Sequence, residues 1–217
     1  MNDKEGKIFI DKPAGWSSFD VVAKVRYQIK YETGLKLKVG HAGTLDPFAT
    51  GLLIVLCGSE TKNQDHYMKL NKEYEATLFL GATSTTGDPE GIISKKDKVN
   101  KVTKAEIEEV IKIFLGEIDQ IPPQYSAIKI NGQRAYQLAR EGKSVKMKPR
   151  KITIISINIL NFDWPKLTLK IECSSGTYIR SLAFDIGEKL GCGAYLTALR
   201  RTKIGKYSVD GAHSLEG

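Results

Sequence analysis

The apolar run from Leu52 to Cys57 constrains the fold of this chain more than any other segment, because six consecutive apolar residues predict a buried strand. The preceding loop, Gly40–Gly51 (GHAGTLDPFATG), brackets one carboxylate, Asp46, with three glycines. Glycine allows a positive φ or a close approach to a ligand, and Pro47 disfavours helix at the residue before it. An acid on such a loop can be a nucleophile or general base, or it can cap its own turn.

The positive charge of the chain is concentrated in one segment. The 217 residues have a formal net charge of +8, which favours a polyanionic partner. From Lys129 to Lys151, eight basic residues stand against one acid (8 − 1 = +7), and Tyr136 lies among them. This pattern is typical of an arm that follows RNA phosphates, although it also fits a solvated loop.

Cysteine and histidine usage indicates neither disulfides nor a metal site. The three cysteines are odd in number and widely spaced, which predicts reduced thiols in a cytoplasmic protein: Cys57, Cys173 and Cys192. The three histidines are equally scattered, so we expect no metal and no cofactor. No apolar run has the length of a signal peptide core or a membrane span, so we expect no membrane association.

Helices and strands are predicted without regular alternation. Ser17 with Asp20, and Thr103 with Glu106, have the spacing of capping boxes that begin helices. Residues 81–91 predict a polar loop. Further helices are expected at residues 133–140 and 177–190, and strands at 7–11, 74–80, 152–162 and 167–173. The mixture predicts an α+β fold with a mixed or largely antiparallel sheet.

Seven motifs in the same order resemble the bacterial tRNA pseudouridine synthase B (TruB) family. The loop around Asp46 resembles the catalytic loop of that family. The others extend the resemblance from about residue 8 to residue 216: DKPAGWSS (11–18), KEYEA (72–76), 83–91, QYSAIK (124–129), CSSGTYIR (173–180) and LRR (199–201).

The resemblance implies a pseudouridine synthase fold and an isomerase without metal or cofactor. The implied reaction converts the uridine at position 55, in the T-loop of tRNA, into pseudouridine after base flipping. Asp46 is then the nucleophile, acting at C1′, at C6 or through a glycal intermediate. Arg180 resembles the arginine that pairs with this carboxylate, although it could be a surface residue in the first helical turn. Tyr74 resembles the tyrosine that stacks on the flipped uracil, although its strand pattern also fits a core aromatic.

The resemblance assigns supporting roles to seven more residues. Tyr178 and Leu199 resemble walls of the uracil pocket, and both also fit a plain core. His41 resembles the residue that takes the place of the flipped base. Lys12 and Asp88 lie on loops near the implied site. The basic arm, about residues 124–151, resembles a mobile thumb loop that closes over the T-arm, and its candidate RNA contacts are Lys129 and Arg140.

Members of the family commonly continue into a C-terminal RNA-binding domain, whereas this sequence stops at Gly217. We therefore expect a single catalytic domain over residues 1–217, acting on tRNA as a monomer. Two alternatives remain open. The basic arm also fits an RNA-binding protein that helps tRNA to fold, and a guide-RNA-dependent synthase of the same superfamily would need accessory proteins. A P-loop NTPase is excluded, because the glycine-rich loop lacks the GK[ST] ending.

Overall fold

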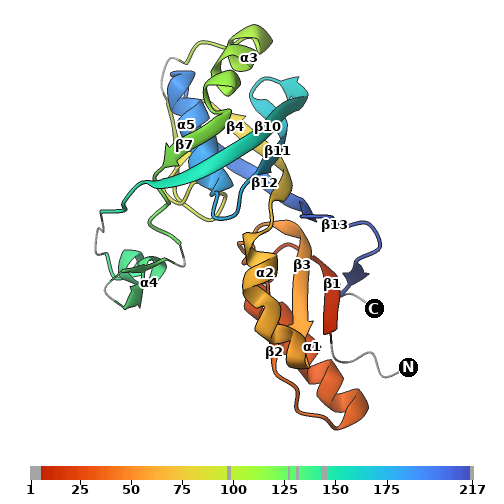
Figure 1. Cartoon of the computed structure of the whole chain (residues 1–217). Helices are drawn as coiled ribbons and strands as arrows, with labels where there is room; N and C mark the ends of the chain where they lie inside the picture. The colour runs from red at the N-terminus through yellow and green to blue at the C-terminus, as the bar shows by residue number, and fades with distance from the viewer. Residues whose placement is uncertain (1–5, 97–98, 127, 131, 143–145, 216–217) are drawn as a thin grey trace. The chain divides into compact units, whose positions relative to one another are not determined.

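The computed structural model describes residues 6–96, 99–126, 128–130, 132–142 and 146–215 (Figure 1). The chain forms two compact units. Unit 1 comprises the chain up to Glu75 together with the chain from Leu199 onward, and unit 2 comprises Ala76–Ala198. Strands β4 (Lys72–Leu80) and β12 (Ala194–Ile204) each run from one unit into the other. The single catalytic domain over residues 1–217 stays a prediction.

The sheet of unit 1 is built around β3 (Thr50–Cys57). Its hydrogen-bonded order is β14-β1-β3-β12, with β2 beside β3 and β13 beside β12. β3 is antiparallel to β1 and β2 and parallel to β12. The other strands of this unit are β1 (Gly6–Lys12), β2 (Val39–His41), β13 (Tyr207–Ser208) and β14 (His213–Ser214).

Helices cover β3 on both of its faces (Figure 1). One set of alternating β3 residues packs with α1 (Ser18–Thr33), and the other set packs with Tyr67 of α2 (Gln64–Lys69), which follows the 3-10 helix η1 (Gly58–Asn63). Since successive strand residues point to opposite faces, a strand covered on both must be apolar at every position. This explains the uninterrupted run Leu52–Cys57 and confirms that it is a buried strand.

Unit 2 contains the strand order β12-β4-β11-β10-β7, in which β10 is antiparallel to both of its neighbours. A two-stranded ribbon, β5-β6, and a small arm, β8-β9 with α4, complete it. The bounds are β5 Ala82–Ser84, β6 Ile93–Lys95, α3 Lys104–Ile113, β7 Gly116–Gln120, β8 Lys129–Ile130, β9 Gln133–Arg134, α4 Ala135–Arg140, β10 Arg150–Asp163, β11 Lys166–Cys173 and α5 Ile179–Lys189. The α+β class and the mixed, largely antiparallel sheet are confirmed.

Local signals predicted the starts of the two capped helices well and the bounds of other elements less well. Both capping boxes are present, at Ser17 and at Thr103. The predicted loop over residues 81–91 is partly wrong, because β5 lies in it and pairs with β6 through cross-strand bonds that no local pattern indicates. The helices predicted from residues 133 and 177 begin two residues later, at Ala135 and Ile179.

Candidate active site

Asp46 lies in the loop between β2 and β3 of unit 1, with a buried residue of this loop on each side of it in sequence. Leu45 and Ala49 are buried, while Asp46 is half-buried. The amide of Ala49 donates to the carbonyl of Asp46 at 3.1 Å and closes a turn around it. Gly51 has a φ of 102° and leads directly into β3. The carboxylate is therefore carried on a tight turn that is anchored in the core on either side.

Lys12 stabilises this loop through hydrogen bonds to main-chain carbonyls. Its side chain is fully buried, and its ammonium donates to the carbonyls of Pro13 (2.9 Å), Trp16 (2.6 Å) and Pro47 (3.2 Å). The amide of Gly15 also donates to the Pro47 carbonyl, at 2.8 Å. Lys12 therefore holds the carbonyl of the residue that follows Asp46, and its supporting role in the reaction stays a prediction.

The other three candidates of unit 1, His41, Tyr74 and Leu199, lie on strands. His41 ends β2, and its carbonyl accepts a hydrogen bond of 2.8 Å from Gln64. Tyr74 is buried on the same face of β4 as Ala76 and Leu78, as the alternating pattern predicts. Leu199 is buried in β12. Burial alone fits both a core residue and a pocket wall, so the roles of Tyr74 and Leu199 stay predictions.

In unit 2 the structure brings Arg180 and Asp88 together. Arg180 is the second residue of α5 and is 5% exposed, which makes the alternative of a surface arginine wrong. Its Nη1 lies 3.4 Å from Oδ2 of Asp88, whose side chain is also buried. The guanidinium further donates to the carbonyls of Thr86 (2.9 Å) and Tyr125 (2.8 Å). A guanidinium held by such a set of acceptors is oriented rigidly.

Loop 81–91 is shaped to receive Arg180. The other oxygen of Asp88 accepts from the hydroxyl of Thr86 and, at 3.0 Å, from the amide of Glu90. Gly87 has a φ of 76°, and a Cβ there would lie 3.3 Å from the Cβ of Arg180. The loop backbone thus packs directly against the first turn of α5.

Gln120 holds the residue that caps α5, a contact that the sequence did not reveal. The amide of Tyr178 donates to Oε1 of Gln120 at 2.8 Å, and Nε2 of Gln120 donates back to the Tyr178 carbonyl at 3.0 Å. Gln120 is buried at the end of β7, 58 residues away in sequence. No local pattern could have identified it, because the pairing depends on the docking of β7 beside α5.

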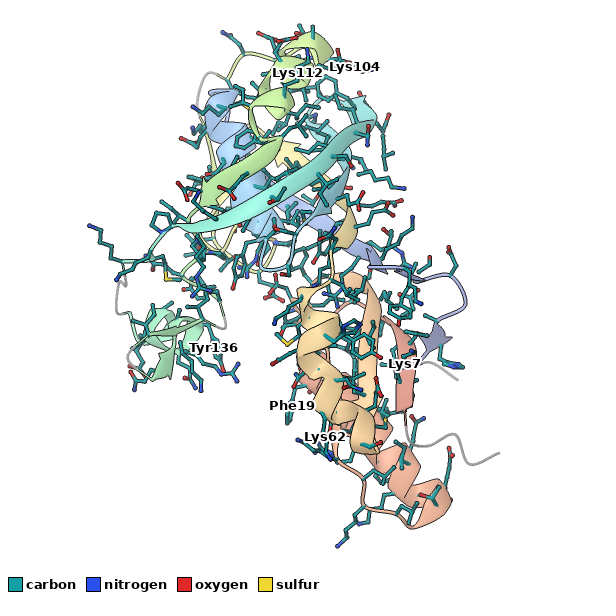
Figure 2. All side chains as sticks on the ribbon, viewed as in Figure 1. Lys7, Phe19, Lys62, Lys104, Lys112 and Tyr136 are labelled. Carbon is teal, nitrogen blue, oxygen red and sulfur yellow. The ribbon has the colours of Figure 1, made fainter. Side chains whose placement is uncertain are left out.

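The described residues of the basic arm form a two-stranded ribbon and one short helix within unit 2. Lys129 is exposed in β8, which pairs with β9 through Lys129 and Arg134. Tyr136 lies on α4 (Figure 2), and its amide donates to the carbonyl of Ser126 at 3.0 Å. Arg140 ends α4, and its side chain lies outside the described residues, as do residues 143–145 of the predicted arm.

The described cysteine, histidine and carboxylate side chains form no metal centre. Among the residues that the structure describes, no group of three or more His, Cys, Asp or Glu side chains could hold a metal ion. Cys57, Cys173 and Cys192 are buried and free of disulfides, and burial raises the pKa of the Cys57 and Cys192 thiols. Such thiols are unreactive. None of the described helices is long and apolar enough to cross a membrane.

Two protein-family models together match most of the chain. The model described as TruB family pseudouridylate synthase (N terminal domain) matches residues 28–179. A second model, described as tRNA pseudouridylate synthase B C-terminal domain, matches residues 180–217.

Curated relatives are similar over nearly the whole of this chain. The chain is 46% identical to tRNA pseudouridine synthase B of Phocaeicola vulgatus, covering 100% of this chain and 93% of that protein. It is 48% identical to the Bacteroides thetaiotaomicron protein of the same name, covering 97% and 90%. For the Clostridium kluyveri protein of the same name the identity is 46%, covering 98% of this chain and 71% of that protein.

Solved structures show the same fold in larger proteins. A chain of the Cbf5-Nop10-Gar1 complex matches 98% of this chain with a TM-score of 0.72 and 30% identity. A chain of the H/ACA RNP bound to a substrate RNA containing 2'-deoxyuridine matches 98% with a TM-score of 0.70 and 29% identity. This chain spans 53% and 51% of those chains, about half their length. The fold is that of the pseudouridine synthases. Within that class, the chain belongs to the TruB family of pseudouridylate synthases.

Proposed function

We propose that this protein isomerises uridine to pseudouridine at position 55, in the T-loop of tRNA. The observation that carries this function is the similarity to tRNA pseudouridine synthase B over the whole chain, which includes the loop with Asp46. The N1–C1′ bond of the uridine breaks, the detached uracil rotates, and a C5–C1′ bond forms in its place. The proton on C5 is released to a base and N1, freed from the sugar, takes up a proton, so the isomerisation consumes no co-reactant.

Asp46 is the proposed nucleophile of this reaction. It acts at C1′, at C6 or by assisting departure through a glycal, and the three routes share the need for an ionised carboxylate held beside the target nucleotide. A closed pocket raises the pKa of a carboxyl group, whereas a neighbouring cation lowers it. We propose Arg180 as that cation, and support for it comes from the CSSGTYIR motif together with the burial and rigid orientation of the guanidinium.

The uridine must leave the RNA stack before Asp46 can reach it. Extrusion of a base costs a few kcal/mol, and stacking of the base on an aromatic side chain returns about 1–3 kcal/mol. Tyr74 is the proposed stacking residue, with Tyr178 and Leu199 as further pocket walls and His41 as the side chain that replaces the base in the RNA. Lys12 and Asp88 act through the groups they hold, the Pro47 carbonyl and Arg180.

The arm over residues 124–151 is the proposed contact with the T-arm of tRNA. Its support is the charge of +7 over Lys129–Lys151 and the exposure of Lys129. Phosphate contacts of this kind fix the register of an RNA without reading its sequence. Lys129 and Arg140 are the proposed contacts. We further propose that the protein acts in the cytoplasm, as a monomer.

Tritium release from tRNA tests this function. The substrate is an unmodified tRNA transcript labelled at C5 of uracil, with no added metal or cofactor. We expect release by the wild-type protein and no release when the uridine at position 55 is replaced by cytidine. Binding of tRNA without release would contradict the proposal and favour a helper of tRNA folding, the function that the basic arm would serve by itself.

A further inference from the structure

Arg201 carries a buried positive charge directly behind the loop of Asp46. It lies in β12 and is 1% exposed. Its guanidinium donates to the carbonyls of Leu52 (Nε, 2.8 Å), Thr44 (Nη1, 3.3 Å) and Gly43 (Nη2, 3.0 Å). Within the described part of the chain, no carboxylate pairs with it. Since an unpaired buried charge is costly, these carbonyls are the groups that hold it there.

Arg201 holds both ends of the loop at once. Its main chain is paired with Gly51, at the end of the loop, in the parallel register of β12 and β3. This contact is so close that a Cβ on Gly51 would lie 2.3 Å from the Arg201 carbonyl oxygen. Its side chain meanwhile binds Gly43 and Thr44, at the beginning of the loop. One residue therefore spans the segment that carries Asp46.

Ser18 holds the residue that directly precedes Asp46. It is 2% exposed and begins α1, and its Oγ accepts from the Leu45 amide at 2.8 Å and donates to the Leu45 carbonyl at 3.1 Å. Both main-chain groups of Leu45 are thus fixed by one hydroxyl. Because α1 is packed on β3 through Val21 and Val22, this hydroxyl cannot shift without the helix.

We infer that Arg201 and Ser18 are positioning residues that set the direction in which the Asp46 carboxylate points. This inference rests on the proposed role of Asp46 as nucleophile. Neither side chain needs to touch the RNA, because each acts through main-chain groups of residues 43–45. A displacement of a reacting group by about 1 Å can slow a reaction roughly 100-fold, so loosening these contacts should impair chemistry more than binding.

Single-turnover kinetics with the tritium-labelled tRNA transcript test the inference. Arg201→Met keeps much of the side-chain volume and removes the donors. We expect its rate at saturating protein to fall about 10- to 100-fold, while the dissociation constant for tRNA changes by less than about threefold. Arg201→Lys should recover part of the rate, because an ammonium reaches some of the carbonyls but cannot span all of them. Ser18→Ala should slow the same step.

The control is Lys203→Met, which removes an exposed cation of the same strand that pairs with Glu73. It should leave the single-turnover rate unchanged. Hydrogen exchange should accelerate at the amides of residues 44–46 and 48–50 in Arg201→Met and Ser18→Ala. A wild-type rate in folded Arg201→Met would overturn the inference. If Arg201→Met does not fold, Arg201→Lys and Ser18→Ala decide in its place: slow chemistry with intact binding supports the inference, and wild-type rates overturn it. Turnover by Asp46→Asn would instead refute the proposed nucleophile.

Discussion

Gly51→Ala should destabilise the protein far more than a glycine replacement usually does. Gly51 has a φ of 102°, and a Cβ there would lie 2.3 Å from the carbonyl oxygen and 2.7 Å from the nitrogen of Arg201. Those atoms belong to a paired strand and cannot move independently. Strain at positive φ costs about 1–3 kcal/mol, and overpacking adds about 1–3 kcal/mol. The free energy of unfolding should therefore fall by about 2–6 kcal/mol.

Gly34→Ala is the matched control for the backbone strain alone. Gly34 caps α1 with a φ of 71°, and a Cβ there would meet nothing within 4 Å. We expect a loss of only about 1–2 kcal/mol at Gly34. For a chain of this size each kcal/mol lowers Tm by about 2–4 °C, so thermal unfolding separates the two variants. A Gly51→Ala protein no less stable than Gly34→Ala would refute the close packing of β3 against β12.

Three further predictions concern other contacts. The Tyr67 hydroxyl donates to Glu60 and lowers the pKa of that carboxyl from its ordinary value of 4.5. The stability that this bond contributes is therefore present above pH 4.5 and is lost as pH falls through the lowered pKa. Urea unfolding should show Tyr67→Phe less stable than wild type at pH 7, and this difference should shrink as the pH is lowered below 4.5. Gln120→Ala should cost about 1–3 kcal/mol in the same assay, because two backbone groups of Tyr178 lose their partner. Gln120→Glu should cost at least as much, because it buries a carboxylate against the Tyr178 carbonyl. Lys129→Gln should weaken the salt dependence of tRNA binding. The slope of log affinity against log salt concentration should become less steep by roughly 0.7–0.9, which is the effect of one lost phosphate contact. An unchanged slope would show that Lys129 makes no phosphate contact.

Local physics was enough to predict several elements of this fold. Ser17 and Asp20 cap α1 because a hydroxyl and a carboxylate at this spacing satisfy free amides at a helix start. The alternation of apolar residues in β4 predicted a strand with one buried face. The uninterrupted apolar run in β3 predicted a strand that is buried on both faces. Leu115 marks a limit of such patterns: it continues the apolar stripe of α3 in sequence, yet it lies beyond the helix and is 45% exposed.

The contacts that shape the candidate site could not be predicted in the same way. Arg201 is a charged residue at a core position, which the ordinary rules of burial disfavour, and its partners are carbonyls that carry no sequence signal. The pair of Arg180 with Asp88 joins residues 92 positions apart. Motif resemblance identified these regions, whereas the contacts themselves arise only when β12 and loop 81–91 are docked.

The exchange of Asp46 for asparagine tests the central claim most directly. Asparagine is nearly isosteric, so it keeps the turn around residue 46 but removes the charge that a nucleophile requires. Tritium release from the labelled tRNA transcript should disappear in Asp46→Asn, while tRNA binding stays within about threefold of wild type. Release at the wild-type rate would contradict the assignment of Asp46 as the nucleophile and the account of the site built around it.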